Sequence, residues 1–417
     1  MEPSLVFAGQ LKTTYYNIQD LRYSTKAGYF LSPQDVDSLF AYEAGLLRDP
    51  VQNQLEKLPL KTYNSDFIFY ANCEELLALE KDYLRTVNDD ASQFPVPLSM
   101  RHSDEITRSR VYSELEGSVN IENVPTTRKR TADLIAQKIK PENRNDVIIL
   151  NMDSAIGFVS EKPEFTKENL RKLYEILSHG CLDEEDQLAP DAFYRNDDVE
   201  IDGYKSCPVD KIESCMDSLF AFVNQNLSNP KYTYLLPHIA HYYLVYIHPY
   251  FDYNGRTSRM ISLWISFLSK AASSFSCFIS EAINQRKSGY FYALEDTRDA
   301  HNDLTYFLIY IYQVSLDYFY CYKNIESIET TLKNKDITLT STQENYLKRI
   351  LISYKGKFSF KDFEKFTMTT MSKVGAFKIL NAFESYGVLK SSLSNSKLKL
   401  FDIDVSWLPY KMSNIKF

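Results

Sequence analysis

A histidine, an aspartate and two arginines lie within the twelve residues from His248 to Arg259. An imidazole titrates near neutral pH, so His248 could act as a general base. Asp252 offers the oxygen ligand that Mg²⁺ takes together with substrate phosphates. Arg256 and Arg259 are three residues apart and could form forked hydrogen bonds to phosphate oxygens. The spacing therefore indicates a site for phosphoryl or nucleotidyl transfer.

Two helices are expected to hold these side chains. An apolar and aromatic helical pattern ends at His248, because Pro249 disfavours a helical conformation in the residue before it. The dipeptide Asn254-Gly255 lets the backbone approach a ligand closely. A second helical pattern begins near Thr257, and the N–H groups at a helix start bind phosphates. A histidine would thus end one helix while a loop opens onto the start of the next.

Each of these residues also has a purely structural interpretation. A lone His248 would more often cap a helix, and a lone Asp252 would more often cap a loop. Arg256 and Arg259 could be a solvated helix start. Positive charge at that end opposes the helix dipole, however, which favours an anionic ligand.

The stretch from His248 to Arg259 resembles the Fic family signature, HPFx[D/E]GNGRxxR. The matching residues are His248, Pro249, Asp252, Asn254, Gly255, Arg256 and Arg259. Tyr250 replaces the usual Phe, which is a mild change. Tyr253 replaces the first glycine, at a position that helps to shape the loop around the α-phosphate. We expect Tyr253 to alter the anion site, the nucleotide fit or the rate.

Residues 118–123, Ser-Val-Asn-Ile-Glu-Asn, resemble the inhibitory motif of the family, [S/T]xxxE[G/N]. The resemblance implies that Glu122 pairs with Arg259 and blocks the γ-phosphate of ATP. This motif lies before the Fic core, as it does in the family members that have an N-terminal inhibitory helix. The alternative is that Glu122 is an exposed helix carboxylate.

Two further segments resemble features of the family, and the resemblance covers roughly residues 105–315. An alternating pattern indicates a short β-hairpin similar to the flap, which holds the target peptide by strand addition; its residues are Val199, Glu200, Ile201 and Asp202. Residues 280–294 look like the helix pair that closes over the adenine, which gives Tyr290 and Phe291 a nucleotide-binding role. These two could instead be core aromatics. Arg298 stands where some relatives have Asn.

The resemblance implies a protein adenylyltransferase that moves AMP from ATP to a Ser, Thr or Tyr hydroxyl of a target protein or of itself. His248 would take the hydroxyl proton, Asp252 would hold Mg²⁺, and Asn254, Gly255 and Arg256 would position phosphates. Transfer of UMP, phosphocholine or a γ-phosphate, and removal of AMP, are alternatives. A DNA-binding regulator with an inactive Fic core is another.

Helical periodicity dominates the chain. The expected fold is mainly α: a Fic helical core with a small β-hairpin flap, an N-terminal helical region and a C-terminal winged helix-turn-helix. The expected domains are an N-terminal helical region at 1–104, a Fic domain with its inhibitory helix at 105–325, and a winged helix-like domain at 341–410. A rise in polarity around residues 325–340 suggests a linker.

The C-terminal segment differs from the rest of the chain in charge. Residues 341–400 carry eleven Lys and Arg against four Asp and Glu, a local net charge of +7 in a chain of net charge −8. Three helical patterns and two short strands follow one another there, in the order of a winged helix. A separate module with its own anionic partner is expected. That partner could be DNA, and the alternative is a basic module that contacts protein.

The remaining composition is that of an ordinary globular chain, with 44% hydrophobic and 24% charged residues. No apolar run approaches the roughly 18 residues needed to span a bilayer, and no signal-peptide pattern is present. The six cysteines form no CxxC pair, which favours a reducing compartment. His238 and His241 lack a third metal ligand and are interpreted as core residues. We expect a cytoplasmic protein with no membrane partner that could form a homodimer.

Overall fold

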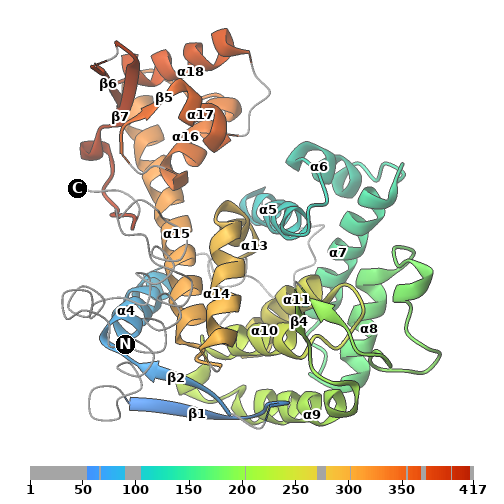
Figure 1. Cartoon of the computed structure of the whole chain (residues 1–417). Coiled ribbons are helices and arrows are strands. Elements are labelled where there is room, and N and C mark those ends of the chain that lie inside the picture. Colours follow the sequence, from blue (N-terminus) through green and yellow to red (C-terminus); the bar gives the residue numbers. More distant parts are fainter. Residues whose placement is uncertain are drawn as a thin grey trace. The chain divides into compact units, whose positions relative to one another are not determined.

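The structure is a computed structural model that describes residues 54–64, 67–89, 105–201, 203–269, 279–300, 302–353, 356–367, 372–395 and 397–413. The predictions for residues 1–53 and 90–104, and for Asp202, lie outside these ranges. The chain divides into two compact units, Met1–Tyr312 and Gln313–Phe417. The described part is mainly helical, as the sequence predicts, and three small sheets accompany the helices (Figure 1).

The described part of the N-terminal region begins with strands. Strands β1 (Gln54–Lys61) and β2 (Phe67–Asn72) pair antiparallel, and helix α4 (Glu74–Asp89) follows. The N-terminal helical region expected from the sequence therefore also contains two strands that were not predicted. Leu58 and Leu60 are buried while Pro59 between them is exposed, and this period of two favours a strand. The backbone N–H of Lys61 donates to Ser218 Oγ at 3.2 Å, which fixes the hairpin on helix α9.

The helices of the first unit follow in chain order, with bounds α5 Glu105–Ile121, α6 Arg128–Ala136, α7 Arg144–Ser160, α8 Lys167–Ser178, α9 Val209–Asn226, α10 Leu236–Ile247, α11 Asn254–Leu268, α13 Ser280–Gln285 and α14 Lys287–Asp299. Short 3₁₀ turns lie at Glu184–Asp186 and Pro230–Tyr232. Helix α10 is buried along nearly its whole length, and α11 packs against it (Figure 1). Helices α5, α7 and α8 contact α11 from other directions. The end of α10 and the start of α11 therefore lie among several packed helices.

The expected β-hairpin between helices is present. Strands β3 (Glu200–Ile201) and β4 (Tyr204–Lys205) pair antiparallel, with Glu200 opposite Lys205 and Ile201 opposite Tyr204. Gly203 in the turn has a φ of +83°, a conformation that glycine adopts without steric cost. We call residues 199–205 the flap.

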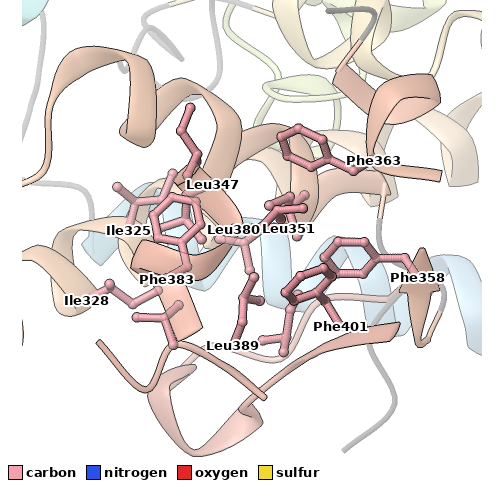
Figure 2. Close-up of a cluster of buried hydrophobic side chains, with 14 of the residues drawn as sticks. Ile325, Ile328, Leu347, Leu351, Phe358, Phe363, Leu380, Phe383, Leu389 and Phe401 are labelled. Atoms are coloured by element: carbon pink, nitrogen blue, oxygen red, sulfur yellow. The ribbon is translucent and has the colours of Figure 1, made fainter. Parts of the chain in front are cut away.

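The second unit contains the expected three helices and two strands, together with one further strand. Its elements are α16 Ser341–Ser353, β5 Phe358–Ser359, α17 Phe360–Thr367, α18 Lys373–Ser385, β6 Leu389–Leu393, β7 Lys399–Ile403 and the 3₁₀ turn Val405–Trp407. The antiparallel sheet has the strand order β5-β7-β6. Apolar side chains from the helices and the sheet form one core (Figure 2). Assignment of this unit to the winged-helix class stays a prediction.

The expected linker around residues 325–340 is largely helical. Helix α15 (Thr305–Lys333) forms its first part, and Ile325 and Ile328 (Figure 2), together with Leu332, are buried in the core of the second unit. Glu326 and Thr330 are exposed between these positions, because a helix can bury one face and expose the other, and further polar residues follow Leu332. Among the described helices, none is both long and apolar enough to cross a bilayer.

Candidate active site

His248 ends helix α10 in the left-handed conformation, with φ 55° and ψ 61°. Its backbone N–H donates to the Leu244 carbonyl at 2.9 Å, which closes the last turn of the helix. Burial, and more weakly the positive charge of Arg195, lower the pKa of His248 to about 4, although a backbone hydrogen bond with Val245 and the charge of Glu122 oppose the shift. The ring is therefore neutral near pH 7, the form that can accept a proton.

Asn254 holds the loop that follows His248. Its side-chain Oδ1 accepts from the Tyr250 N–H at 3.0 Å, and its Nδ2 donates to the Tyr250 carbonyl at 2.8 Å. The Tyr250 ring is buried and stacks on Tyr174 with centroids 3.9 Å apart. The amide of Asn254 is thus used within the loop, and the Phe-to-Tyr change at 250 lies in the core.

Tyr253 keeps a backbone conformation that suits glycine. It precedes α11 with a φ of +67°, a region that costs a residue with a Cβ roughly 1–2 kcal/mol. Its ring is buried, and the Arg256 guanidinium lies over it at 3.4 Å from the centroid. The substitution therefore preserves the path of the loop and adds a cation–π contact beneath one of the two arginines.

Arg256 and Asp252 form the outer part of the site. Nη2 of Arg256 lies 3.4 Å from both carboxylate oxygens of Asp252, whose side chain is 42% exposed. Nε of Arg256 is buried and has no hydrogen-bond partner among the described residues. A buried unpaired donor on a charged group is costly, so this nitrogen is suited to an anion.

Arg259 and Glu122 form an ion pair across 137 positions of sequence, with Nη2 2.8 Å from Oε1. Arg259 also donates to Ser118, from Nε to Oγ at 3.0 Å and from Nη2 to the carbonyl at 3.1 Å. Burial alone would raise the pKa of Glu122, but Arg259, and more weakly Arg256 and Lys287, hold it below its usual value. The structure brings Glu122 and Arg259 together as the sequence resemblance implies.

Gly255 makes room for the Glu122 carboxylate at the start of α11. A Cβ on Gly255 would lie 2.4 Å from Oε1 of Glu122, so no larger residue fits there without displacing the carboxylate. Helix N-termini bind anions, and the Glu122 carboxylate lies at this one. Nη1 of Arg259 has no hydrogen-bond partner in the described part of the chain. An anion site therefore exists here, and an internal carboxylate occupies part of it.

Lys287, at the start of α14, was not singled out from the sequence. Its Nζ donates to the Asn120 carbonyl at 3.2 Å and to Asn123 Oδ1 at 2.7 Å, on either side of Glu122. These two hydrogen bonds hold the C-terminal end of α5 next to Lys287. A lone lysine carries no spacing signal, so only the fold could reveal it.

Glu114, one helical turn before Ser118 on α5, holds the same helix against α13. Its carboxylate accepts from the backbone N–H of Ser280 at 2.7 Å and from the Ser280 hydroxyl. Burial raises the pKa of Glu114 to about 7, although the Ser280 hydrogen bonds oppose the shift. A Cβ on Gly117 would lie 2.5 Å from the backbone nitrogen of Glu281, so the two helices meet backbone to backbone.

The two aromatics expected at the adenine lie in different environments. Tyr290 is buried, and its hydroxyl is 2.9 Å from His241 Nε2. Phe291 is 45% exposed, so it alone presents its ring to solvent. His238 and His241 are buried core residues, as interpreted from the sequence. Arg298 lies over the ring of Tyr204 in the flap, 4.0 Å from its centroid.

The carboxylates near the loop fit a magnesium ion bound together with a nucleotide. Among the described residues, no three side chains of His, Cys, Asp or Glu gather into a metal cage. Asp252 is accessible and close enough to Asp186 to raise the pKa of that carboxyl, although burial is the larger cause. Mg²⁺ usually takes one or two carboxylates and completes its shell with phosphates and water.

The site is formed by the end of helix α10 at His248 and the start of helix α11 at Asn254. The sequence model of the Fic/DOC family matches residues 164–266, which include both. This chain therefore contains a domain of the Fic/DOC family.

A curated relative is the protein adenylyltransferase Fic of Drosophila willistoni. It is 26% identical over 158 residues, which cover 36% of this chain and 30% of that protein. The chain thus matches less than a third of the length of this relative.

Solved structures of two Fic proteins are similar to the chain. A Fic family protein from Desulfovibrio desulfuricans has 17% identity and a TM-score of 0.48, and the match covers 80% of this chain and 97% of that one. Fic-1 from C. elegans has 16% identity and a TM-score of 0.40, and the match covers 58% of this chain and 70% of that one.

Proposed function

We propose that this protein is an adenylyltransferase that moves AMP from ATP to a hydroxyl of a protein, and that Glu122 inhibits it. The observation that carries the proposal is the anion site at the start of α11, where Glu122 pairs with Arg259 at 2.8 Å beside a neutral His248. A relative named protein adenylyltransferase supports the identity of the transferred group. The proposed target carries a Ser, Thr or Tyr hydroxyl, either on another protein or on the chain itself.

His248 is the proposed general base. Its neutral ring accepts the proton of the target hydroxyl while the hydroxyl oxygen forms a bond to the α-phosphorus. The bond from that phosphorus to the bridging oxygen of pyrophosphate breaks, and pyrophosphate leaves. The backbone N–H groups at the start of α11 would stabilise the charge that develops on the α-phosphate oxygens.

Gly255 and Arg256 are the proposed phosphate contacts, and Asn254 shapes the loop through its two hydrogen bonds to Tyr250. Asp252 would hold Mg²⁺, which when bound neutralises phosphate charge. Phe291 is the proposed adenine contact, because its ring is exposed. Tyr290 is buried, and its hydroxyl lies 2.9 Å from His241 Nε2. Val199, Glu200 and Ile201 of the flap would pair with the target backbone.

Inhibition is a competition for one guanidinium. The Glu122 carboxylate and the γ-phosphate of ATP are both anions, and Arg259 can form its charge-assisted hydrogen bonds with only one of them at full strength. Lys287 stabilises the inhibited arrangement through Asn120 and Asn123. ATP could then bind in a form that misplaces its α-phosphorus, which would suppress transfer.

Intact-mass analysis tests the transferred group. Wild type and Glu122→Gly would be incubated with Mg²⁺ and each nucleoside triphosphate in turn. We expect a mass gain of one AMP residue with ATP, larger in the variant. A gain of UMP or of a single phosphate would replace adenylylation by another Fic-type transfer. No gain with any nucleotide or added target, together with no ATP binding, would favour the regulator with an inactive core.

A further inference from the structure

Arg195 precedes the flap and is buried, with 3% of its surface exposed. Its side chain donates four hydrogen bonds: from Nε to the His248 carbonyl at 2.9 Å, from Nη1 to the Asp197 carbonyl at 2.6 Å, and from Nη2 to Ser206 Oγ at 2.9 Å and to the Cys207 carbonyl. Its backbone N–H donates to the Pro249 carbonyl at 2.9 Å. One residue thus uses both its backbone and its guanidinium to hold the chain around it.

No buried carboxylate balances this charge among the described residues. The nearest is Asp198, whose Oδ1 lies 3.9 Å from Nη1 and whose side chain is 74% exposed. Burial lowers the pKa of Arg195, but a guanidinium stays protonated in proteins. Burying a charge without a matched partner is costly, and the four hydrogen bonds of the guanidinium offset that cost. The positions of the groups that accept hydrogen bonds from Arg195 indicate the role of its guanidinium.

The acceptors belong to two parts of the site. The carbonyls of His248 and Pro249 form the corner between α10 and the phosphate loop. Asp197 precedes the flap, while Ser206 and Cys207 follow it. Ser206 in turn closes the base of the flap, since both its N–H and its hydroxyl donate to the Val199 carbonyl, at 3.2 and 2.8 Å. The guanidinium therefore joins the catalytic corner to both ends of the flap.

We propose that Arg195 is a positioning residue that holds the His248 corner and the flap at a fixed spacing, so that a target hydroxyl on the flap meets the base. His248 has a left-handed backbone, and the hydrogen bond from Arg195 fixes the orientation of its carbonyl. The inference rests on the proposed function, because it assigns the flap to the target and His248 to proton transfer.

The charge of Arg195 has a second effect. Two charged groups act on His248: Arg195, which opposes protonation of the ring, and Glu122 on α5, which favours it. In the Glu122→Gly form only the first of these remains, so the ring is held neutral by burial and by Arg195. Removing the guanidinium should therefore raise the pKa of His248.

Two substitutions at Arg195, made in the Glu122→Gly background, separate position from charge. Lysine keeps the positive charge but cannot form the forked contacts, whereas glutamine removes the charge. Arg171→Gln is the matched control: Arg171 also donates to a carbonyl before the flap, that of Ala192, and pairs with Glu175, but among the described residues it makes no hydrogen bond to His248. The titration of His248 is followed by NMR without nucleotide, and only six histidines need assignment.

For Arg195→Gln we expect the pKa of His248 to rise above that of the Glu122→Gly parent, while burial still holds it below its ordinary value, and we expect the acid limb of the pH profile of kcat to shift upward with it. For Arg195→Lys we expect a low pKa with kcat reduced by about tenfold or more, and an almost unchanged KM for ATP. The control should match the parent in both titration and acid limb.

An unchanged His248 titration in folded Arg195→Gln, or full kcat in Arg195→Lys, would overturn the proposal. If glutamine prevents folding, the lysine variant still decides, because it keeps the charge. The NMR titration does not depend on AMP transfer. An unlabelled Glu122→Gly parent would therefore count against the proposed function, while the titration would still judge the effect of Arg195 on His248.

Discussion

At the scale of single residues, the motif from His248 to Arg259 was readable from sequence because its chemistry depends on residue type and spacing. The helix stop at His248 follows from Pro249, and the close backbone approach at Gly255 follows from the missing side chain. Lys287, Glu114 and Arg195 could not be found in this way. Each acts through contacts with residues that are distant in sequence, such as the pair Lys287 and Asn123.

Tyr253 gives a prediction at this scale. Changing Tyr253 to glycine should relieve about 1–2 kcal/mol of left-handed backbone strain. It should also remove a buried ring, which typically costs about 3–5 kcal/mol, so the variant should be less stable by roughly 2 kcal/mol. Urea denaturation measures the difference, with Tyr253→Phe as the control that keeps the ring under Arg256. Equal or greater stability of the glycine variant would show that the ring contributes little.

At the scale of elements, the inhibitory helix α5 is held by contacts at both ends of its last two turns. Glu114 binds the Ser280 backbone and hydroxyl, and Lys287 binds Asn120 and Asn123. The sequence predicted this helix and the flap, but it missed the hairpin of β1 and β2. The helical periodicity that dominates the chain suggested a helical region. Around Leu58 and Leu60, however, buried and exposed residues alternate, and this segment forms a strand.

Glu122→Gly should raise labelling, because it frees Arg259 for the γ-phosphate. Lys287→Met should raise labelling as well, but by less, since it loosens the end of α5 and leaves the Glu122 carboxylate in place. Initial rates of self-labelling or target labelling at fixed ATP give the comparison. Lys323→Met, which breaks an exposed ion pair with Glu326 in the second unit, serves as the control. Lower activity in Lys287→Met would instead make Lys287 part of the nucleotide site.

Glu114 predicts a pH-dependent stability of the contact between α5 and α13. Its folded pKa of about 7 lies above the unfolded value of 4.5. The stability it contributes is therefore fully present below pH 4.5 and is lost as the pH rises through 7. Relative to wild type, Glu114→Gln should gain stability between pH 5 and pH 8. Denaturation curves at these two pH values measure the gain, and a constant difference would mean that Glu114 titrates normally.

At the scale of the whole molecule, the chain joins a Fic domain to a small C-terminal unit with its own core. The charge break near Ser341 and the order of helices and strands predicted that unit. Helix α15 contributes Ile325, Ile328 and Leu332 to the core of that unit, although the polarity around residues 325–340 suggested a linker there. Periodicity over a longer window would have been the better signal there.

Ion pairs within the second unit engage some of its basic side chains, so fewer of them are available to an anionic partner. Lys390 pairs with Asp404 at 2.8 Å and Lys399 with Glu384 at 2.6 Å, while Lys378 on α18 is exposed. If the unit binds DNA through α18, the affinity of the full chain should fall steeply with salt, and Lys378→Glu should weaken it for every sequence. Fluorescence anisotropy with a labelled duplex measures both effects. No binding at low salt would assign the basic face to a protein contact.

Position-specific labels of ATP test directly whether His248 drives transfer of AMP. Glu122→Gly would be incubated with ATP carrying phosphorus-32 at either the α or the γ position, beside the double variant Glu122→Gly/His248→Ala. We expect label on protein only from the α position, reduced by about 10²–10⁴-fold in the double variant, with ATP binding retained. Label from the γ position, or equal α label in the double variant, would contradict the account.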